Sequence, residues 1–254
     1  MITITLSNQK GGVAKTTTSS ALALGLSHKG FKVLAVDLDP QCNLCLGSGL
    51  DPMQMDNTLY NVFKKSADIS DIILHSPLGY DFIPGGLMLA GADMDFTQTG
   101  REYMLSEALD AISDKYDYAI IDTPPTLGIL TVNALTASQK IIIPMTADAY
   151  SLQGLSQLNT LVQSIRKYCN RDLSIMGLLI TKYNGRQTVS KAVEEMIQNA
   201  AAQLQTKVFA SKIRESVAIR EASLLQNDFF AEAPKANATQ DYNSFVEEVL
   251  NDGK

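Results

Sequence analysis

The sequence predicts an α/β fold in which helices cover both faces of a mostly parallel central sheet. Short runs of β-branched and other apolar residues alternate with segments of helical periodicity, from the first residues almost to the last. This alternation makes the strands parallel, because each strand is then joined to the next through a helix. No repeat, low-complexity tract or Pro/Gly/Ser-rich linker divides the 254 residues, so we expect a single domain over residues 1–254.

Each strand is predicted where apolar and β-branched residues cluster between turn-forming residues. These runs lie at residues 2–7, 32–37, 80–84, 116–122, 139–146 and 173–181. Helices are predicted at residues 15–28, 57–65, 187–205 and 239–251, the second of them after a turn at Asp51 and Pro52.

Composition excludes several classes of protein. With 45% hydrophobic and 19% charged residues the chain is an ordinary globular one, neither disordered nor fibrous. Its apolar runs are far shorter than the roughly 20 residues that cross a bilayer, and its N-terminus lacks a signal pattern. Three cysteines cannot all pair within one chain, which favours a reducing compartment. We therefore expect a soluble, cytoplasmic protein.

Charge is unevenly distributed along the chain. The net charge is −6, yet residues 166–220 hold ten basic and four acidic side chains and carry +6, which leaves −12 for the rest. Such asymmetry is typical of a surface that binds a polyanion. The alternative is that these charges lie on solvated helix faces.

The most informative stretch is Ser7-Asn-Gln-Lys-Gly-Gly-Val-Ala-Lys-Thr-Thr-Thr18, between the first strand and the first helix. It departs from the pattern G-x-x-x-x-G-K-[ST], because Gln9 and Ala14 replace glycines. Gly11 and Gly12 nevertheless allow backbone N–H groups to turn toward a phosphate, and the helix after them offers further free N–H groups. The stretch therefore predicts a phosphate-binding loop.

Two side chains that follow this loop suit a nucleotide and its metal. Lys15 is placed to reach the β- and γ-phosphates, and the Thr16 hydroxyl can bind Mg²⁺. The alternative is a glycine-containing turn with a coincidental lysine. Because strand, glycines, lysine and threonines stand in the required order, we expect the phosphates of a nucleotide and Mg²⁺ to bind here.

Carboxylates end two of the predicted strands. Asp37 and Asp39 are two residues apart, so both can project from the same side of an extended backbone, and Asp122 ends another buried strand. The carboxyl ends of parallel strands face the ligand crevice. A buried acid there needs a cation or hydrogen-bond donors. The alternative for each is a residue that caps the next turn.

Several of these segments resemble one known family. Residues 10–17, KGGVAKTT, are similar to the deviant Walker A motif of the ParA/MinD class of P-loop ATPases, and residues 37–41, DLDPQ, are similar to its DxDPQ motif. Further matches at residues 118–135, 142–155 and 213–222 extend the resemblance over nearly the whole chain. It implies the P-loop NTPase three-layer fold.

The resemblance also implies roles for individual residues. Lys10 would reach the ATP of a partner subunit in a sandwich dimer, and Asp39 would orient or activate the attacking water. Asp37 and Asp122 would join Thr16 around Mg²⁺, Asp122 as the Walker B residue, and residues 123–135 would respond to the γ-phosphate. ATP would be bound by the following residues: Lys10, Gly11, Gly12, Val13, Ala14, Lys15, Thr16 and Thr17.

Within the class, the resemblance points to the ParA partition ATPases. The tail of residues 241–254 is acidic, whereas MinD-like proteins end in a basic amphipathic helix, so we expect no membrane binding. The implied function is weak, switch-like ATP hydrolysis that segregates a plasmid or chromosome. An ATP-bound homodimer would bind double-stranded DNA without sequence preference on the nucleoid, and a ParB-type centromere-binding protein would stimulate hydrolysis. With a first strand at residue 2, no N-terminal helix-turn-helix module is expected.

Contacts to DNA and to adenine are expected in the basic segment. The DNA candidates are Arg186, Lys191, Lys212, Arg214 and Arg220. Some of these could instead pair with nearby acids at positions 194, 195, 215 and 221. The resemblance places adenine between residues 181–185 and 213–215, with Asn184 and Arg214 as contacts, although an Asn-Gly pair is equally a turn former.

Two other functions stay open. The same class includes ATPases that serve metal-cluster assembly or another positioning role, and a third alternative is a nucleotide-binding regulator without turnover. Cys42 and Cys45 have the spacing of half a zinc site, which needs two more ligands. Since only His28, His75 and Cys169 are candidates for these, we expect packed thiols.

Overall fold

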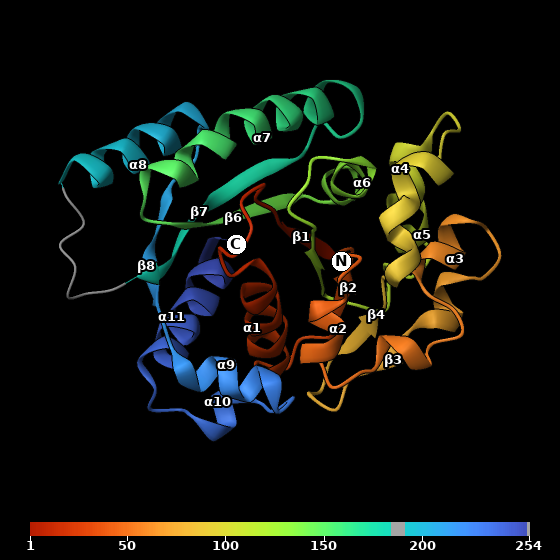
Figure 1. Cartoon of the computed structure of the whole chain (residues 1–254), viewed down its shortest axis with the longest axis horizontal. Coiled ribbons are helices and arrows are strands. Elements are labelled where there is room, and N and C mark those ends of the chain that lie inside the picture. Colours follow the sequence, from red (N-terminus) through yellow and green to blue (C-terminus); the bar gives the residue numbers. More distant parts are fainter. Residues whose placement is uncertain (184–190, 253–254) are drawn as a thin grey trace.

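The computed structural model describes residues 1–183 and 191–252, and these contain a central eight-stranded sheet (Figure 1). Its strands lie in the order β3-β4-β2-β5-β1-β6-β7-β8, and the β3–β4 pair alone is antiparallel. The strands are β1 (Ile2–Leu6), β2 (Val33–Asp37), β3 (Leu74–His75), β4 (Asp81–Ile83), β5 (Tyr118–Asp122), β6 (Lys140–Thr146), β7 (Ser174–Tyr183) and β8 (Val208–Arg214). The predicted mostly parallel α/β architecture is confirmed.

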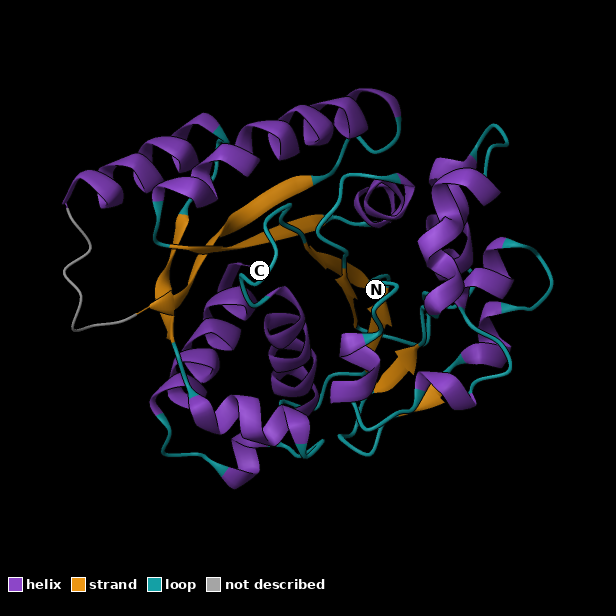
Figure 2. Cartoon of the chain, viewed as in Figure 1, coloured by secondary structure: helices purple, strands orange, loops and turns teal. Residues whose placement is uncertain are grey.

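Helices cover the sheet on both faces, as Figure 2 shows. One layer contains α1 (Lys15–His28), α2 (Asn43–Gly47), α9 (Val217–Leu224), α10 (Phe229–Glu232) and α11 (Asn237–Asp252). The other contains α3 (Leu59–Phe63), α4 (Ala92–Asp95), α5 (Met104–Asp110), α6 (Ile129–Ala137), α7 (Ala149–Tyr168) and α8 (Lys191–Gln203). No helix in the described ranges has the length and apolar character needed to span a bilayer.

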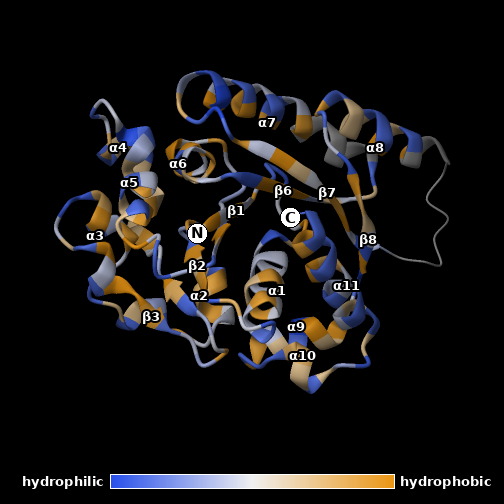
Figure 3. Ribbon diagram, turned by 180° about the vertical axis from the view of Figure 1, so that it is seen from behind, coloured by the Kyte–Doolittle hydropathy of each residue, from blue (hydrophilic) through white to orange (hydrophobic). Residues whose placement is uncertain are grey.

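Strand β2 illustrates why the central strands are apolar at nearly every position. All five of its residues are buried. Val33 and Ala35 pack in the core beneath α1, whereas Leu34 and Val36 pack in the core on the opposite face. Because successive side chains of a strand point to opposite faces, a sheet covered on both sides favours an apolar residue at each position. Figure 3 shows the resulting hydrophobic strands in the interior.

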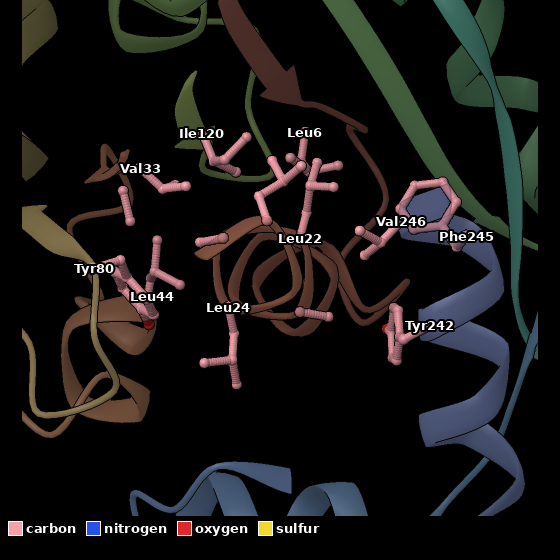
Figure 4. Close-up of a cluster of buried hydrophobic side chains, with 14 of the residues drawn as sticks. Leu6, Leu22, Leu24, Val33, Leu44, Tyr80, Ile120, Tyr242, Phe245 and Val246 are labelled. Atoms are coloured by element: carbon pink, nitrogen blue, oxygen red, sulfur yellow. The ribbon is translucent and has the colours of Figure 1, made fainter. Parts of the chain in front are cut away.

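Helices α1 and α11 pack closely at Gly25. A Cβ atom at this position would lie 2.6 Å from Cγ2 of Val246, so only glycine permits the observed approach. Tyr242, Phe245 and Val246 of α11 extend toward α1 in Figure 4. The Tyr242 hydroxyl also lies 3.1 Å from the Thr18 hydroxyl. The C-terminal helix thus supports the helix that follows the predicted phosphate loop.

The C-terminal half contains elements that were not predicted. These are strand β8, the 20-residue helix α7 and the shorter helices α6, α9 and α10. Pairing between β7 and β8 is irregular, with Leu178 opposite Val208 but Ile180 opposite Lys212, so β8 lacks the regular alternation that predicts a strand. Consequently the predicted loops at residues 181–185 and 213–215 both begin inside strands. The first residues of the helix predicted at 187–205 lie outside the described residues.

Candidate functional site

The predicted phosphate loop, residues 8–14, connects β1 to α1 and is held by hydrogen bonds to β6 and β7. The Asn8 side chain donates a 2.7 Å hydrogen bond to the Pro144 carbonyl, and the Thr181 hydroxyl donates one of 3.0 Å to the Val13 carbonyl. Gly11 and Gly12 are exposed, and Gly12 has φ +73°. The two glycines therefore expose their backbone to solvent, while neighbouring strands hold the two ends of the loop.

Helix α1 begins directly after this loop, at Lys15. Its N-cap residue, Ala14, has φ +62° and ψ +33°, and no side chain in the described ranges caps the helix. Uncapped N–H groups at a helix N-terminus attract anions, because the helix dipole is positive there. The N-terminus of α1 therefore suits the phosphates for which the sequence predicts it.

Lys15 lies almost buried beside the loop, with 7% of its surface exposed. Its Nζ donates to the Lys10 carbonyl over 3.3 Å, so the side chain folds back toward the loop. Burial lowers the pKa of Lys15, whereas the nearby Asp122 and Asp39 carboxylates raise it in part. A phosphate at this position would supply the negative charge that a buried ammonium needs.

Asp122 ends β5 and is held by two hydroxyls of α1. Thr16 Oγ1 donates to its Oδ2 over 2.6 Å, and Ser19 Oγ donates to its Oδ1 over 2.9 Å. Burial raises the pKa of Asp122 to about 6, although these hydrogen bonds and Lys15 counteract the rise. Hydroxyl and carboxylate oxygens are the donors that Mg²⁺ prefers. Thr16 and Asp122 therefore fit the predicted metal site, and Ser19 is a contributor that the sequence analysis missed.

Asp37 and Asp39 lie at the end of the neighbouring strand, where Asp37 is the register partner of Asp122. Asp39 is 8% exposed and accepts a 3.0 Å hydrogen bond from the Gln41 N–H. Asp37 is fully buried and accepts N–H groups from Asp39 and Cys45, each over 3.0 Å. Burial and the Asp122 charge raise the pKa of Asp37 well above its usual range. Its hydrogen bonds are those of a capping residue, the alternative that the sequence left open.

The Lys10 side chain forms an ion pair within its own subunit. Its Nζ lies 2.8 Å and 2.9 Å from the two carboxylate oxygens of Asp148 and 3.2 Å from the Thr146 hydroxyl, at the end of β6. Its backbone N–H also donates to the Asn8 side chain over 2.9 Å. In this conformation the Lys10 ammonium is paired within the subunit.

The late segments predicted to flank adenine do meet. Tyr183 is opposite Arg214 in the sheet, and the Glu215 N–H donates to the Tyr183 carbonyl. The Arg214 guanidinium, however, binds the Asp241 carboxylate through hydrogen bonds of 2.8 Å and 2.6 Å. Asn184 lies outside the described residues.

The DNA candidates differ in what surrounds them. Lys212 lies 5.2 Å from the centre of the Tyr183 ring, and Arg220 lies 3.4 Å from Glu215, one of the acids expected to compete for it. Lys191 is the first residue of α8, and Arg186 lies outside the described residues.

Cys42 and Cys45 are buried next to the Asp37 carboxylate. Burial raises the pKa of both thiols, that of Cys45 to about 12. Within the described ranges no group of three or more His, Cys, Asp or Glu side chains could hold a metal ion. The structure therefore supports packed thiols rather than a zinc site.

Comparison with known proteins identifies the family of this chain. Residues 1–175 match a family model described as an AAA domain. The chain is 38% identical to the sporulation initiation inhibitor protein Soj of Bacillus subtilis, over 98% of both chains. It is 35% identical to the chromosome partitioning protein ParA of Caulobacter vibrioides, over 97% of this chain and 93% of that one.

A solved structure agrees with this assignment at the level of the fold. Cobyrinic acid a,c-diamide synthase from Mycobacterium smegmatis, with bound ADP and magnesium, superposes with a TM-score of 0.85 at 30% identity, over 98% of this chain and 94% of that one. The phosphate loop, the carboxylates at the ends of β2 and β5, and the full-length similarity to Soj and ParA agree: the chain belongs to the ParA/Soj family of P-loop ATPases.

Proposed function

We propose that this protein is a DNA partition ATPase in which ATP binding and hydrolysis switch DNA binding on and off. The observation that carries the proposal is the convergence of Lys15, Thr16, Asp39 and Asp122 beside the uncapped N-terminus of α1. The similarity to the chromosome partitioning protein ParA supports the same conclusion.

Each group of the site has a task in this proposal. Residues 10–17 bind the phosphates through backbone N–H groups and the Lys15 ammonium. Thr16 and Asp122 would hold Mg²⁺, which when bound would neutralise phosphate charge. Asp39 accepts a hydrogen bond from the attacking water and thereby orients it toward the γ-phosphate.

Lys10 acts when two subunits meet. In the proposed sandwich dimer its ammonium stabilises the negative charge on the partner subunit's ATP, as an arginine finger does. To do so it must leave Asp148, which holds it within the subunit. ATP binding and dimerisation would therefore include an exchange of ion-pair partners.

The dimer binds DNA through phosphate contacts without reading sequence. Among the described candidates, Lys212 lies beside Tyr183 on the last strand of the sheet, whereas Arg214 and Arg220 are paired with Asp241 and Glu215. A ParB-type centromere-binding protein then stimulates hydrolysis, which separates the dimer and releases DNA. This cycle places the protein on the nucleoid.

A second candidate function is ATP-driven small-molecule chemistry. Its support is the similarity to cobyrinic acid a,c-diamide synthase. The identity to the chromosome partitioning protein ParA is higher, 35% against 30%, so we favour partition.

The deciding experiment measures binding to random-sequence duplex DNA with ATP, with ADP and without nucleotide, over a salt series. We expect binding with ATP that weakens steeply with salt and is lost in Lys10→Ala. Lys29→Ala, a lysine paired with Glu247 on α11, is the matched control and should bind as wild type does. Absence of DNA binding in every nucleotide state would favour the small-molecule alternative.

A companion experiment tests the assigned chemistry. Lys15→Ala should abolish ATP binding, whereas Asp39→Ala should bind ATP and form the dimer without turnover. Normal hydrolysis by Asp39→Ala would show that another group orients the water.

A further inference from the structure

Asp37 has a different environment from the other two carboxylates of the site. Both of its oxygens are occupied by backbone donors: Oδ1 accepts the Asp39 N–H and Oδ2 accepts the Cys45 N–H, each at 3.0 Å. Asp122, in contrast, accepts from side-chain hydroxyls, one of them the predicted metal ligand Thr16. The Asp37 carboxylate is therefore bound by backbone N–H groups, whereas the Asp122 carboxylate is bound by side chains that include the predicted metal ligand.

The two N–H groups bound by Asp37 lie at the two ends of one tight segment, residues 39–45. Between them the chain turns back on itself, because the Cys42 N–H donates to the Asp39 carbonyl over 2.9 Å and the Gln41 N–H to the Asp39 side chain over 3.0 Å. Cys42 adopts φ +54° at the start of α2 and caps that helix with no side-chain hydrogen bond. The Asp37 carboxylate thus closes the segment at both ends.

We propose that Asp37 is a positioning residue for Asp39 rather than a ligand of the magnesium ion. It fixes the backbone N–H of Asp39 itself, and through Cys45 it fixes the helix turn that follows, so the Asp39 carboxylate is held in one place relative to Lys15 and Asp122. This inference rests on the proposed ATP hydrolysis for its kinetic consequence, but its structural part stands without it.

Substitution by asparagine separates the two roles. In Asp37→Asn the amide side chain would keep one carbonyl oxygen for one N–H but would face the other N–H with its own NH₂ group. One end of the segment would therefore lose its acceptor. A shift of about 1 Å at a catalytic group costs up to about 100-fold in rate. A metal ligand changed to asparagine would instead raise the Mg²⁺ concentration required for activity.

The test compares Asp37→Asn with Asp122→Asn, its matched control on the adjacent strand. ATP binding, Mg²⁺ titration and steady-state kinetics are measured on the full chain. We expect Asp37→Asn to lower kcat by about tenfold or more while KM for ATP and the half-saturating Mg²⁺ concentration stay within about twofold. Asp122→Asn should raise the Mg²⁺ requirement. A raised Mg²⁺ requirement in Asp37→Asn, or an unchanged kcat, would overturn the proposal.

A second measurement does not depend on turnover. Hydrogen exchange of residues 39–46 reports directly on the N–H groups that Asp37 binds, and it should be faster in Asp37→Asn than in wild type, while exchange in β5 and α11 is unchanged. Equal exchange in this segment would refute the positioning role. If wild-type protein hydrolysed no ATP, the proposed function would fail, and this exchange measurement would still decide the role of Asp37.

Discussion

The left-handed backbone at Ala14 has a measurable cost. The general phosphate-loop pattern places glycine directly before the lysine, and here an alanine with φ +62° occupies that position. A left-handed L-residue costs roughly 1–2 kcal/mol, of which the greater chain entropy of glycine when unfolded offsets about 0.5–1 kcal/mol. We therefore expect Ala14→Gly to raise the free energy of unfolding by about 0.5–1 kcal/mol.

Urea denaturation of the nucleotide-free protein would measure this gain. Ala21→Gly is the control, because Ala21 lies inside α1, where glycine lowers stability by about 0.5–1 kcal/mol. If both glycine variants lost stability alike, strain at Ala14 would be negligible.

The pairing of Lys10 with Asp148 predicts a second effect at a single residue. Both side chains are partly exposed, at 33% and 39%, so their ion pair contributes about 0.5–1 kcal/mol at most. If Lys10 must leave this pair in the dimer, Asp148→Asn should lower the ATP concentration that gives half-maximal dimer by roughly two- to fivefold.

Analytical ultracentrifugation over an ATP series would show that shift. Asp114→Asn, an acid far along the chain from Lys10 and near the end of the α5 region, serves as the control and should change nothing. An unaltered ATP dependence in Asp148→Asn would mean that the exchange of partners does not limit dimerisation.

At the scale of elements, α11 stabilises β8 through carboxylates. Glu248 accepts the Ala210 and Ser211 N–H groups, at 2.9 Å and 3.1 Å, and Asp241 accepts the Arg214 N–H at 3.0 Å. Burial raises the pKa of Glu248, but these N–H groups and Lys207 together outweigh that effect, so the net pKa lies below its usual value. The folded state therefore favours the ionised carboxylate.

The sign of this shift sets a pH dependence. A depressed pKa contributes stability above the ordinary value of a glutamate, and that contribution is lost as the pH falls through the lower folded pKa. Glu248→Gln should therefore destabilise the protein by about 1–2 kcal/mol at pH 7. Urea titrations at pH 7 and below pH 4.5 should show the difference from wild type shrinking with acid. A difference that is constant with pH would exclude a role for the charge.

The same elements show what the sequence can and cannot reveal. Strand-end acids, the glycines of the phosphate loop and the order of β1, α1 and β2 depend on local patterns, and these were predicted. Ser19 is a hydroxyl within a helix and gave no sign that it bonds Asp122, 103 residues away. The Lys10–Asp148 pair spans 138 residues, and Arg214 meets Asp241 only because α11 returns along β8. Contacts made by the tertiary fold have no sequence spacing from which to predict them.

At the scale of the whole molecule, the basic segment is partly neutralised by the fold. Lys207 pairs with Glu248 and Asp252, and Arg214 pairs with Asp241, all of them acids outside residues 166–220. The excess of +6 in residues 166–220 therefore overstates the charge offered to DNA. The region that binds DNA is expected to be narrower than the sequence suggests.

Lys212 provides the test of that region. We expect Lys212→Ala to weaken ATP-dependent DNA binding for all sequences alike and to reduce the slope of log affinity against log salt by about 1. Lys64→Ala is the control, because Lys64 packs over Tyr60 and Phe96 in the layer of α3. Fluorescence anisotropy with two unrelated duplexes would measure both effects. An unchanged salt slope would remove Lys212 from the interface.

The carboxylates of α11 also hinder the addition of a strand from a second copy of the chain at the edge of the sheet. Strand β8 is the last strand of the sheet, and an edge strand with unpaired N–H groups is a template on which a strand of another chain can add. Glu248 and Asp241 occupy the Ala210, Ser211 and Arg214 N–H groups of that edge. Detachment of α11 would therefore convert a folded monomer into a seed for intermolecular sheet growth, so its docking guards solubility as well as stability.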